Sequence, residues 1–187
     1  MNRREWLLGS AGVAAAAAGL GAGWALHRQQ AESLAVMEEA VPPSVAAVPA
    51  SLWTASFTQP GGGELHMADL RGKPLLINFW ATWCPPCVKE MPDLDRFHRN
   101  FASQGWQVVG LAVDAPTPVR EFLQRTPVHF PIGLAGLTGT ELGLALGNTQ
   151  GGLPFSVVIG RTGKLLWRKL GASSYDELAA KAVEWAG

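Results

Sequence analysis

Two cysteines separated by two residues are the part of this sequence best suited to chemistry. Cys84 and Cys87 are the only cysteines in the 187 residues, so no framework of several structural disulfides can form. A lone Cys-x-x-Cys pair can cycle between dithiol and disulfide, because one thiolate attacks a disulfide and the other resolves the mixed species. The spacing therefore predicts a redox site.

The surroundings of the pair indicate which cysteine reacts first. The apolar run from Pro74 to Trp80 predicts a buried strand before it, and the apolar spacing over residues 88–101 predicts a helix after it. Backbone N–H groups at a helix N-terminus stabilise a thiolate. We expect Cys84, at the exposed end of the motif, to be the nucleophile and Cys87, one turn inward, to resolve the mixed disulfide.

The residues around the two cysteines are candidates for contact with a substrate. Pro85 and Pro86 stiffen the loop, remove two N–H donors and suit the first turn of a helix. Trp83 offers a flat apolar surface beside the nucleophile, and Trp80 is either a site residue or core.

Metal binding is the alternative use of such a pair. Zinc prefers four ligands, and His66, His98 and His129 stand singly without ligand spacing. Copper delivery needs fewer ligands, with His129 as the available helper. We expect no metal and no other cofactor, although a copper chaperone or redox sensor remains an alternative.

Charge and composition narrow the classes of partner. Lys plus Arg and Asp plus Glu number 15 each, and no basic cluster suggests nucleic-acid binding. Apolar residues make up 48% of the chain, enough for an ordinary core.

The N-terminal segment has the pattern of an export signal or membrane anchor. Arg3-Arg4 precede an uncharged stretch from Trp6 to Leu26, long enough to cross a bilayer. The basic residues favour a cytoplasmic N-terminus, and the pattern is similar to a twin-arginine signal. We expect residues 1–28 to place the rest on the periplasmic side of a bacterial inner membrane, anchored there or released by cleavage.

The remaining chain divides into a linker and one domain. Residues 29–50 are proline-stiffened linker, and residues 51–187 form an α/β domain with a central mixed sheet flanked by helices. An N-terminal β-hairpin extension is predicted from Leu52–Thr58 and Glu64–Met67, and a C-terminal helix begins after an N-cap at Ser173 or Ser174.

The block from Asn78 to Pro92, which reads NFWATWCPPCVKEMP, resembles the active site of the TlpA/ResA-type thioredoxin-like disulfide reductases. Arg71-Gly72-Lys73-Pro74, the strand ending at Asp114 and Gly152-Leu153-Pro154 extend the similarity. The resemblance implies a thioredoxin-like fold, related to the redoxin and peroxiredoxin group.

The resemblance also implies roles for single residues. Cys84 and Cys87 match the redox pair, and Pro154 matches a cis-proline that presents the backbone of Leu153 to a bound substrate. Glu90 matches an acid that tunes thiol ionisation and proton transfer; an ordinary exposed carboxylate is the alternative.

Three positions depart from what the related proteins carry. Asn78 stands where cytoplasmic thioredoxins have a buried Asp, which moves proton acceptance to Glu90 or water. Phe155 replaces a small hydroxyl residue and is either core or a wall of the substrate groove. Gly160 replaces a frequent Asp.

The function implied is an exported thiol-disulfide oxidoreductase that reduces protein clients, for example apocytochrome c. Reduction outside the cytoplasm requires a membrane electron donor of the DsbD or CcdA type, and we expect a monomer. A thiol peroxidase of the peroxiredoxin group is the other alternative.

Overall fold

The computed structural model describes residues 48–185, and the expected export segment and most of the expected linker lie outside that range. Between residues 48 and 185, no helix is long and apolar enough to span a bilayer.

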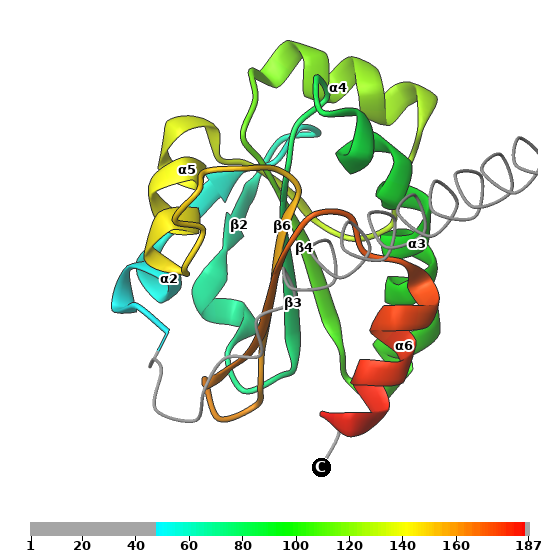
Figure 1. Cartoon of the computed structure of the whole chain (residues 1–187). Coiled ribbons are helices and arrows are strands. Elements are labelled where there is room, and N and C mark those ends of the chain that lie inside the picture. The colour runs from blue at the N-terminus through cyan, green and yellow to red at the C-terminus, as the bar shows by residue number, and fades with distance from the viewer. Residues whose placement is uncertain (1–47, 186–187) are drawn as a thin grey trace, which may run out of the picture. The chain divides into compact units, whose positions relative to one another are not determined.

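A mixed five-stranded sheet forms the centre of the described part (Figure 1). Its order is β5-β4-β3-β6-β7, with β3, β4 and β5 parallel and with β6 and β7 antiparallel to their neighbours. The predicted mixed sheet is confirmed. The strands are β3 (Leu75–Trp80), β4 (Gln107–Ala112), β5 (Ile132–Leu134), β6 (Phe155–Ile159) and β7 (Leu165–Leu170).

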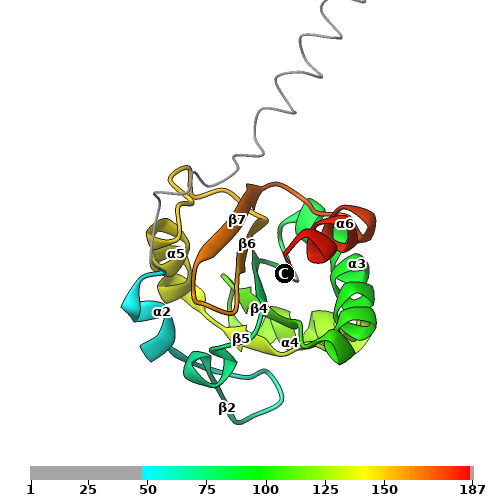
Figure 2. The same cartoon turned by 90° about the horizontal axis from the view of Figure 1, so that it is seen from below.

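Helices cover both faces of this sheet, with α3 and α6 on one side and α2 and α5 on the other (Figure 2). Both faces of β3 are buried, which explains its continuous apolar sequence. The helices are α2 (Ala50–Thr54), α3 (Pro85–Phe101), α4 (Pro116–Arg125), α5 (Gly136–Ala145) and α6 (Tyr175–Glu184), with short 3₁₀ turns η1 (Met67–Leu70) and η2 (Ala102–Gln104).

Alternation along the strands divides the apolar side chains into two cores. Leu76 and Trp80 of β3 face α3, whereas Leu75, Ile77 and Phe79 face the opposite side. Trp80 is completely buried and packs on Phe122, so it belongs to the core rather than to the surface of the site.

The N-terminal extension differs from the prediction in its first half. A single helical turn, α2, replaces the start of the predicted strand, and only β1 (Ser56–Thr58) pairs with β2 (Glu64–His66). The turn places Leu52 in the core, where it is fully buried. A run of five residues is too short for its periodicity to distinguish a helical turn from a strand.

Helix α3 begins at Pro85, so the two prolines stand in its first turn as the sequence indicated, ahead of the apolar spacing over residues 88–101. Pro85 and Pro86 occupy the first two helical positions, where an N–H has no partner within the helix and its loss costs little. The prolines therefore place the second cysteine inside the helix and the first at its cap.

Candidate functional site

The cysteine pair lies at the point where β3 passes into α3. Cys84 is the N-cap residue, its Sγ accepts a hydrogen bond from the Cys87 N–H at 3.3 Å, and the two sulfurs form a disulfide. In the reduced protein, a Cys84 thiolate at this place has the same N–H and the positive end of the helix dipole to stabilise it. This geometry supports Cys84 as the nucleophile.

Both cysteines are more buried than the sequence suggested. Cys84 is 4% exposed and Cys87 is 0% exposed, so the expectation that Cys84 stands on an exposed side was wrong, although Cys84 is the more accessible of the two. Trp83, in contrast, is 66% exposed. Pro85 and Pro86, which follow Cys84 directly, are exposed as well.

A small hollow lies beside this surface. It has a volume of about 170 Å³, and Trp83 and Leu153 line it together with residues of β3, α5 and the loop after α5. The Leu153–Pro154 peptide bond is cis, as the resemblance implied. Asn148 donates a hydrogen bond to the Gly152 carbonyl at 2.9 Å and so orders the loop that leads to this bond. The sequence offered no signal for Asn148.

Glu90 is a buried carboxylate, not an exposed one. It is 2% exposed, and it accepts hydrogen bonds from Asn78 Nδ2 at 2.8 Å and from the Ser173 N–H at 2.7 Å. Burial raises the pKa of Glu90 from 4.5 to about 7, against the opposing effects of these two hydrogen bonds and of the Lys169 ammonium. A carboxyl group with such a pKa can accept and return a proton near neutral pH.

Glu90 and Cys87 share one face of α3. They are three residues apart in the same helix, the spacing that brings side chains together on one face. Both are buried on the side where α3 packs against the sheet. The structure therefore places Glu90, whose raised pKa lets it exchange protons near neutral pH, one helical turn from Cys87.

The substitutions at Asn78 and Phe155 have different consequences. Asn78 is completely buried and donates to Glu90 and to Ser156 Oγ at 3.0 Å, so it holds the carboxyl group instead of exchanging protons itself. Phe155 is buried against Phe79 on the other face of the sheet, with ring centroids 5.9 Å apart. Phe155 is thus core.

Two further positions that the sequence singled out lie away from the chemistry. Pro154 precedes β6 and Gly160 follows it. The extended strand between them puts these two residues about 20 Å apart. His129 pairs with Asp95 of α3 through its ring Nδ1 at 3.1 Å and its backbone N–H at 2.6 Å.

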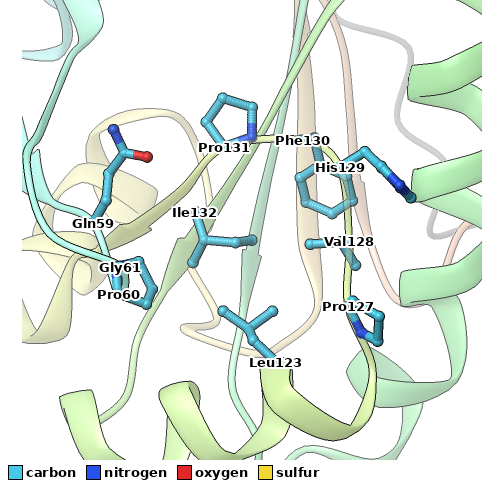
Figure 3. Close-up of a pocket in the computed structure, with 10 residues that line it drawn as sticks. All are labelled: Gln59, Pro60, Gly61, Leu123, Pro127, Val128, His129, Phe130, Pro131 and Ile132. Carbon is cyan, nitrogen blue, oxygen red and sulfur yellow. The ribbon is translucent and has the colours of Figure 1, made fainter.

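A second hollow, shown in Figure 3, is lined by His129 but by neither cysteine and not by Glu90. It has a volume of about 360 Å³ between the β1–β2 turn, α4 and the segment 127–132, and the side chain of His129 points away from its centre. Within residues 48–185, no group of three or more His, Cys, Asp or Glu side chains could hold a metal ion. His129 is therefore not part of such a group among these residues.

The loop before the cysteines is held by a contact that the sequence did not indicate. Asp114, two residues after the end of β4, accepts hydrogen bonds from the Thr82 N–H at 2.8 Å and from Thr82 Oγ1 at 2.6 Å. The carboxyl ends of the parallel strands β3 and β4 meet at this edge of the sheet, so Asp114 fixes the chain just ahead of Trp83.

Comparisons with known proteins agree with this geometry. The Redoxin family model matches residues 43–183. Thiol-disulfide oxidoreductase ResA of a Bacillus cereus strain is 30% identical over 119 residues, which cover 63% of this chain and 66% of that protein. ResA of Bacillus subtilis (strain 168) is 38% identical over 74 residues, covering 39% and 41%. Both alignments cover less than two thirds of the relative's own length.

Solved structures show the same fold. A thiol:disulfide interchange protein of the thioredoxin family from Chlorobium tepidum TLS has a TM-score of 0.65 and 28% identity, with 77% of this chain and 99% of that chain covered. The structure of MTB dsbF in mixed oxidized and reduced forms has a TM-score of 0.63 and 28% identity, with 74% and 98% covered. The predicted thioredoxin-like fold is confirmed.

Proposed function

Since the chain belongs to the Redoxin family, we propose that it is a thiol-disulfide oxidoreductase that reduces disulfides in protein clients. The observation that carries the proposal is the Cys84–Cys87 disulfide at the N-terminus of α3, with Glu90 buried on the same helix face. The names of the ResA relatives support the same activity.

The first step is attack by the reduced Cys84. Its thiolate attacks one sulfur of a client disulfide, a Cys84–client disulfide forms, and the client's own disulfide breaks. The first client thiolate leaves and takes up a proton from water. The Cys87 N–H and the α3 dipole stabilise the attacking thiolate, and the cis Leu153–Pro154 segment beside the hollow offers backbone for the client to bind.

The second step releases the client. The Cys87 thiol gives its proton to the Glu90 carboxylate, and the Cys87 thiolate attacks Cys84 Sγ. The Cys84–Cys87 disulfide forms, and the second client thiolate leaves and is protonated. Two electrons have then passed from the dithiol to the client, and a separate donor must return the protein to its reduced form.

The cellular setting is part of the proposal and rests on the sequence before residue 48. The basic residues and the uncharged stretch from Trp6 to Leu26 support export to the periplasmic side of the membrane. In that compartment, a membrane donor of the DsbD or CcdA type would supply electrons, apocytochrome c is one client whose thiols need to be kept reduced, and the protein acts as a monomer.

Trapping of the mixed disulfide tests the proposal. In Cys87→Ser, a client attached to Cys84 cannot be released by Cys87. Disulfide-linked adducts should therefore accumulate in cells, and they should dissociate when the gel sample is treated with a reductant. Cys84→Ser should form none, and its insulin-reduction rate should fall to that of the buffer. Absence of adducts in Cys87→Ser, with Cys84 still reactive toward a thiol reagent, would contradict the exchange mechanism.

A further inference from the structure

A row of polar side chains crosses the otherwise apolar sheet beneath α3. Asn78 of β3 is registered with Ser156 of β6, and Ser156 is registered with Lys169 of β7. Directly opposed residues on neighbouring strands point to the same face. All three side chains therefore lie on the face that carries α3 and α6, among core residues such as Val158 and Trp167.

The row of Asn78, Ser156 and Lys169 contacts Glu90 at one end and includes a partly exposed ion pair at the other. Asn78 donates to both Glu90 and Ser156. Lys169, two strands away, donates to both carboxylate oxygens of Glu177 on α6, at 2.7 and 2.8 Å. The side chains of Lys169 and Glu177 are 21% and 20% exposed, so this pair stands between the core and solvent.

A single turn of backbone also connects the two carboxylates. The Ser173 N–H donates to Glu90 Oε2 at 2.7 Å, and the next N–H, that of Ser174, donates to Glu177 Oε2 at 3.3 Å. Adjacent peptide groups thus hold a completely buried acid and a partly exposed one. The outer pair is thus linked to Glu90 by this turn, and Lys169 lies two strand positions from Asn78, which donates to Glu90.

We propose that the Lys169–Glu177 pair is a positioning device that sets the protonation of Glu90 from the surface, and with it the resolving step at Cys87. This inference deepens the proposed function and depends on it. Lys169 does not touch the reacting sulfurs; it acts through Glu90.

The two members of the pair act on Glu90 in opposite directions. The Lys169 ammonium lowers the pKa of Glu90, and the Glu177 carboxylate raises it. The groups that donate hydrogen bonds to Glu90 are neutral, namely the Asn78 amide of β3 and the Ser173 N–H of the β7–α6 turn, and Ser156 of β6 contacts Asn78. Loss of Lys169 alone should therefore leave an acid that ionises less readily.

The test compares variants that remove one charge each. Lys169→Met should raise the pH midpoint of Glu90 by about 0.3 to 1 unit, since Lys169 and Asn78 stand two strand spacings apart. Glu177→Gln should lower it, while Lys169→Arg should restore the original midpoint. Lys164→Met makes the same substitution at an exposed position of the same hairpin and should change nothing.

Two readouts separate this inference from the proposed function. Carboxyl ¹³C NMR titration of the oxidised protein, with Glu90→Gln to assign the signal, gives the midpoint without any turnover. Single-turnover release of insulin from the Cys84 mixed disulfide should slow about two- to tenfold in Lys169→Met at a pH below the midpoint.

The direction of the NMR shifts decides the outcome. Opposite shifts in Lys169→Met and Glu177→Gln support the inference, whereas equal midpoints or shifts in one direction overturn it. If the NMR shifts occur but no variant, wild type included, forms a mixed disulfide, the proposed function fails and the role of the pair in resolution fails with it.

Discussion

At the scale of single residues, the decisive group is Glu90. The sequence suggested an acid near the pair but left an exposed carboxylate as the alternative. The structure buries it and surrounds it with one side-chain donor and one backbone donor. Asn78 suits both protonation states of this acid, because its Nδ2 can donate to the carboxylate and its Oδ1 can, after an amide flip, accept from the carboxylic acid.

Removal of the Glu90 charge should stabilise the oxidised protein at alkaline pH. The pKa of Glu90 is about 7 in the folded state and 4.5 when unperturbed, so the folded protein binds this proton more tightly than the unfolded chain does. The stability that results is complete below pH 4.5 and is lost as the pH rises to about 7, an effect of about 3 kcal/mol.

The Glu90→Gln variant does not lose this stability as the pH rises, because its side chain does not ionise. Its free energy of unfolding in urea should match that of the wild type near pH 4.5 and exceed it by up to about 3 kcal/mol at about pH 8. A difference that does not change over this pH range would show that Glu90 does not titrate within it.

At the scale of elements, capping residues decide where the helices begin. Cys84 and two prolines start α3, and α3 continues through Pro92 to Phe101 without a break. Ser174 starts α6 with a complete capping box, in which Ser174 Oγ accepts from the Glu177 N–H and the Glu177 carboxylate accepts from the Ser174 N–H. The sequence predicted an N-cap at Ser173 or Ser174, and the structure shows that it is Ser174.

Loss of the α6 N-cap should lower the free energy of unfolding by an amount typical of such caps. Ser174→Ala removes the acceptor for the Glu177 N–H, and we expect the free energy of unfolding to fall by about 1 kcal/mol. Ser103→Ala, an equal substitution at an exposed position of η2, serves as the control and should change it by less than about 0.5 kcal/mol. Equal effects of the two substitutions would speak against a capping role.

At the scale of the whole molecule, the sheet separates two cores and carries the polar row through one of them. Glu90 of α3 is held by Asn78 of β3 and by the turn between β7 and α6, and Ser156 of β6 contacts Asn78 in turn. On the far side of Asn78, the registered residue of β4 is Gly110. A Cβ at Gly110 would lie 2.6 Å from Ile132 Cδ1 and 3.1 Å from Trp80 Nε1, so the row ends against close-packed core.

A methyl group at Gly110 should therefore disturb the centre of the fold. Gly110→Ala should lower the free energy of unfolding by about 1 to 3 kcal/mol through overpacking. Gly61→Ala, where no atom lies within 4 Å of the added Cβ, is the matched control and should be close to neutral. Thermal unfolding of both proteins measures the difference, and an unchanged midpoint for Gly110→Ala would contradict the packing argument.

The redox pair, the order of the central strands along the chain and the helix after the cysteines could all be predicted from the sequence. These features depend on local signals: two cysteines at a fixed spacing, continuous apolar runs, and capping or turn residues. Local signals also explain the error at Ala50–Thr54, because one helical turn is too short to show its period.

The burial of Glu90 and the identity of the neighbours that tune it depend on the tertiary fold and could not be predicted from the sequence. Ser156, Lys169 and Ser173 lie far from Glu90 in the chain, and strand register and the β7–α6 turn bring them to it. Burial raises the pKa of the carboxyl group because the charged form loses its hydration, and hydration depends on everything packed around the group. The Cys-x-x-Cys spacing thus indicates thiol-disulfide exchange. The packing of α3 on the sheet sets the pH at which Glu90 takes up or releases its proton.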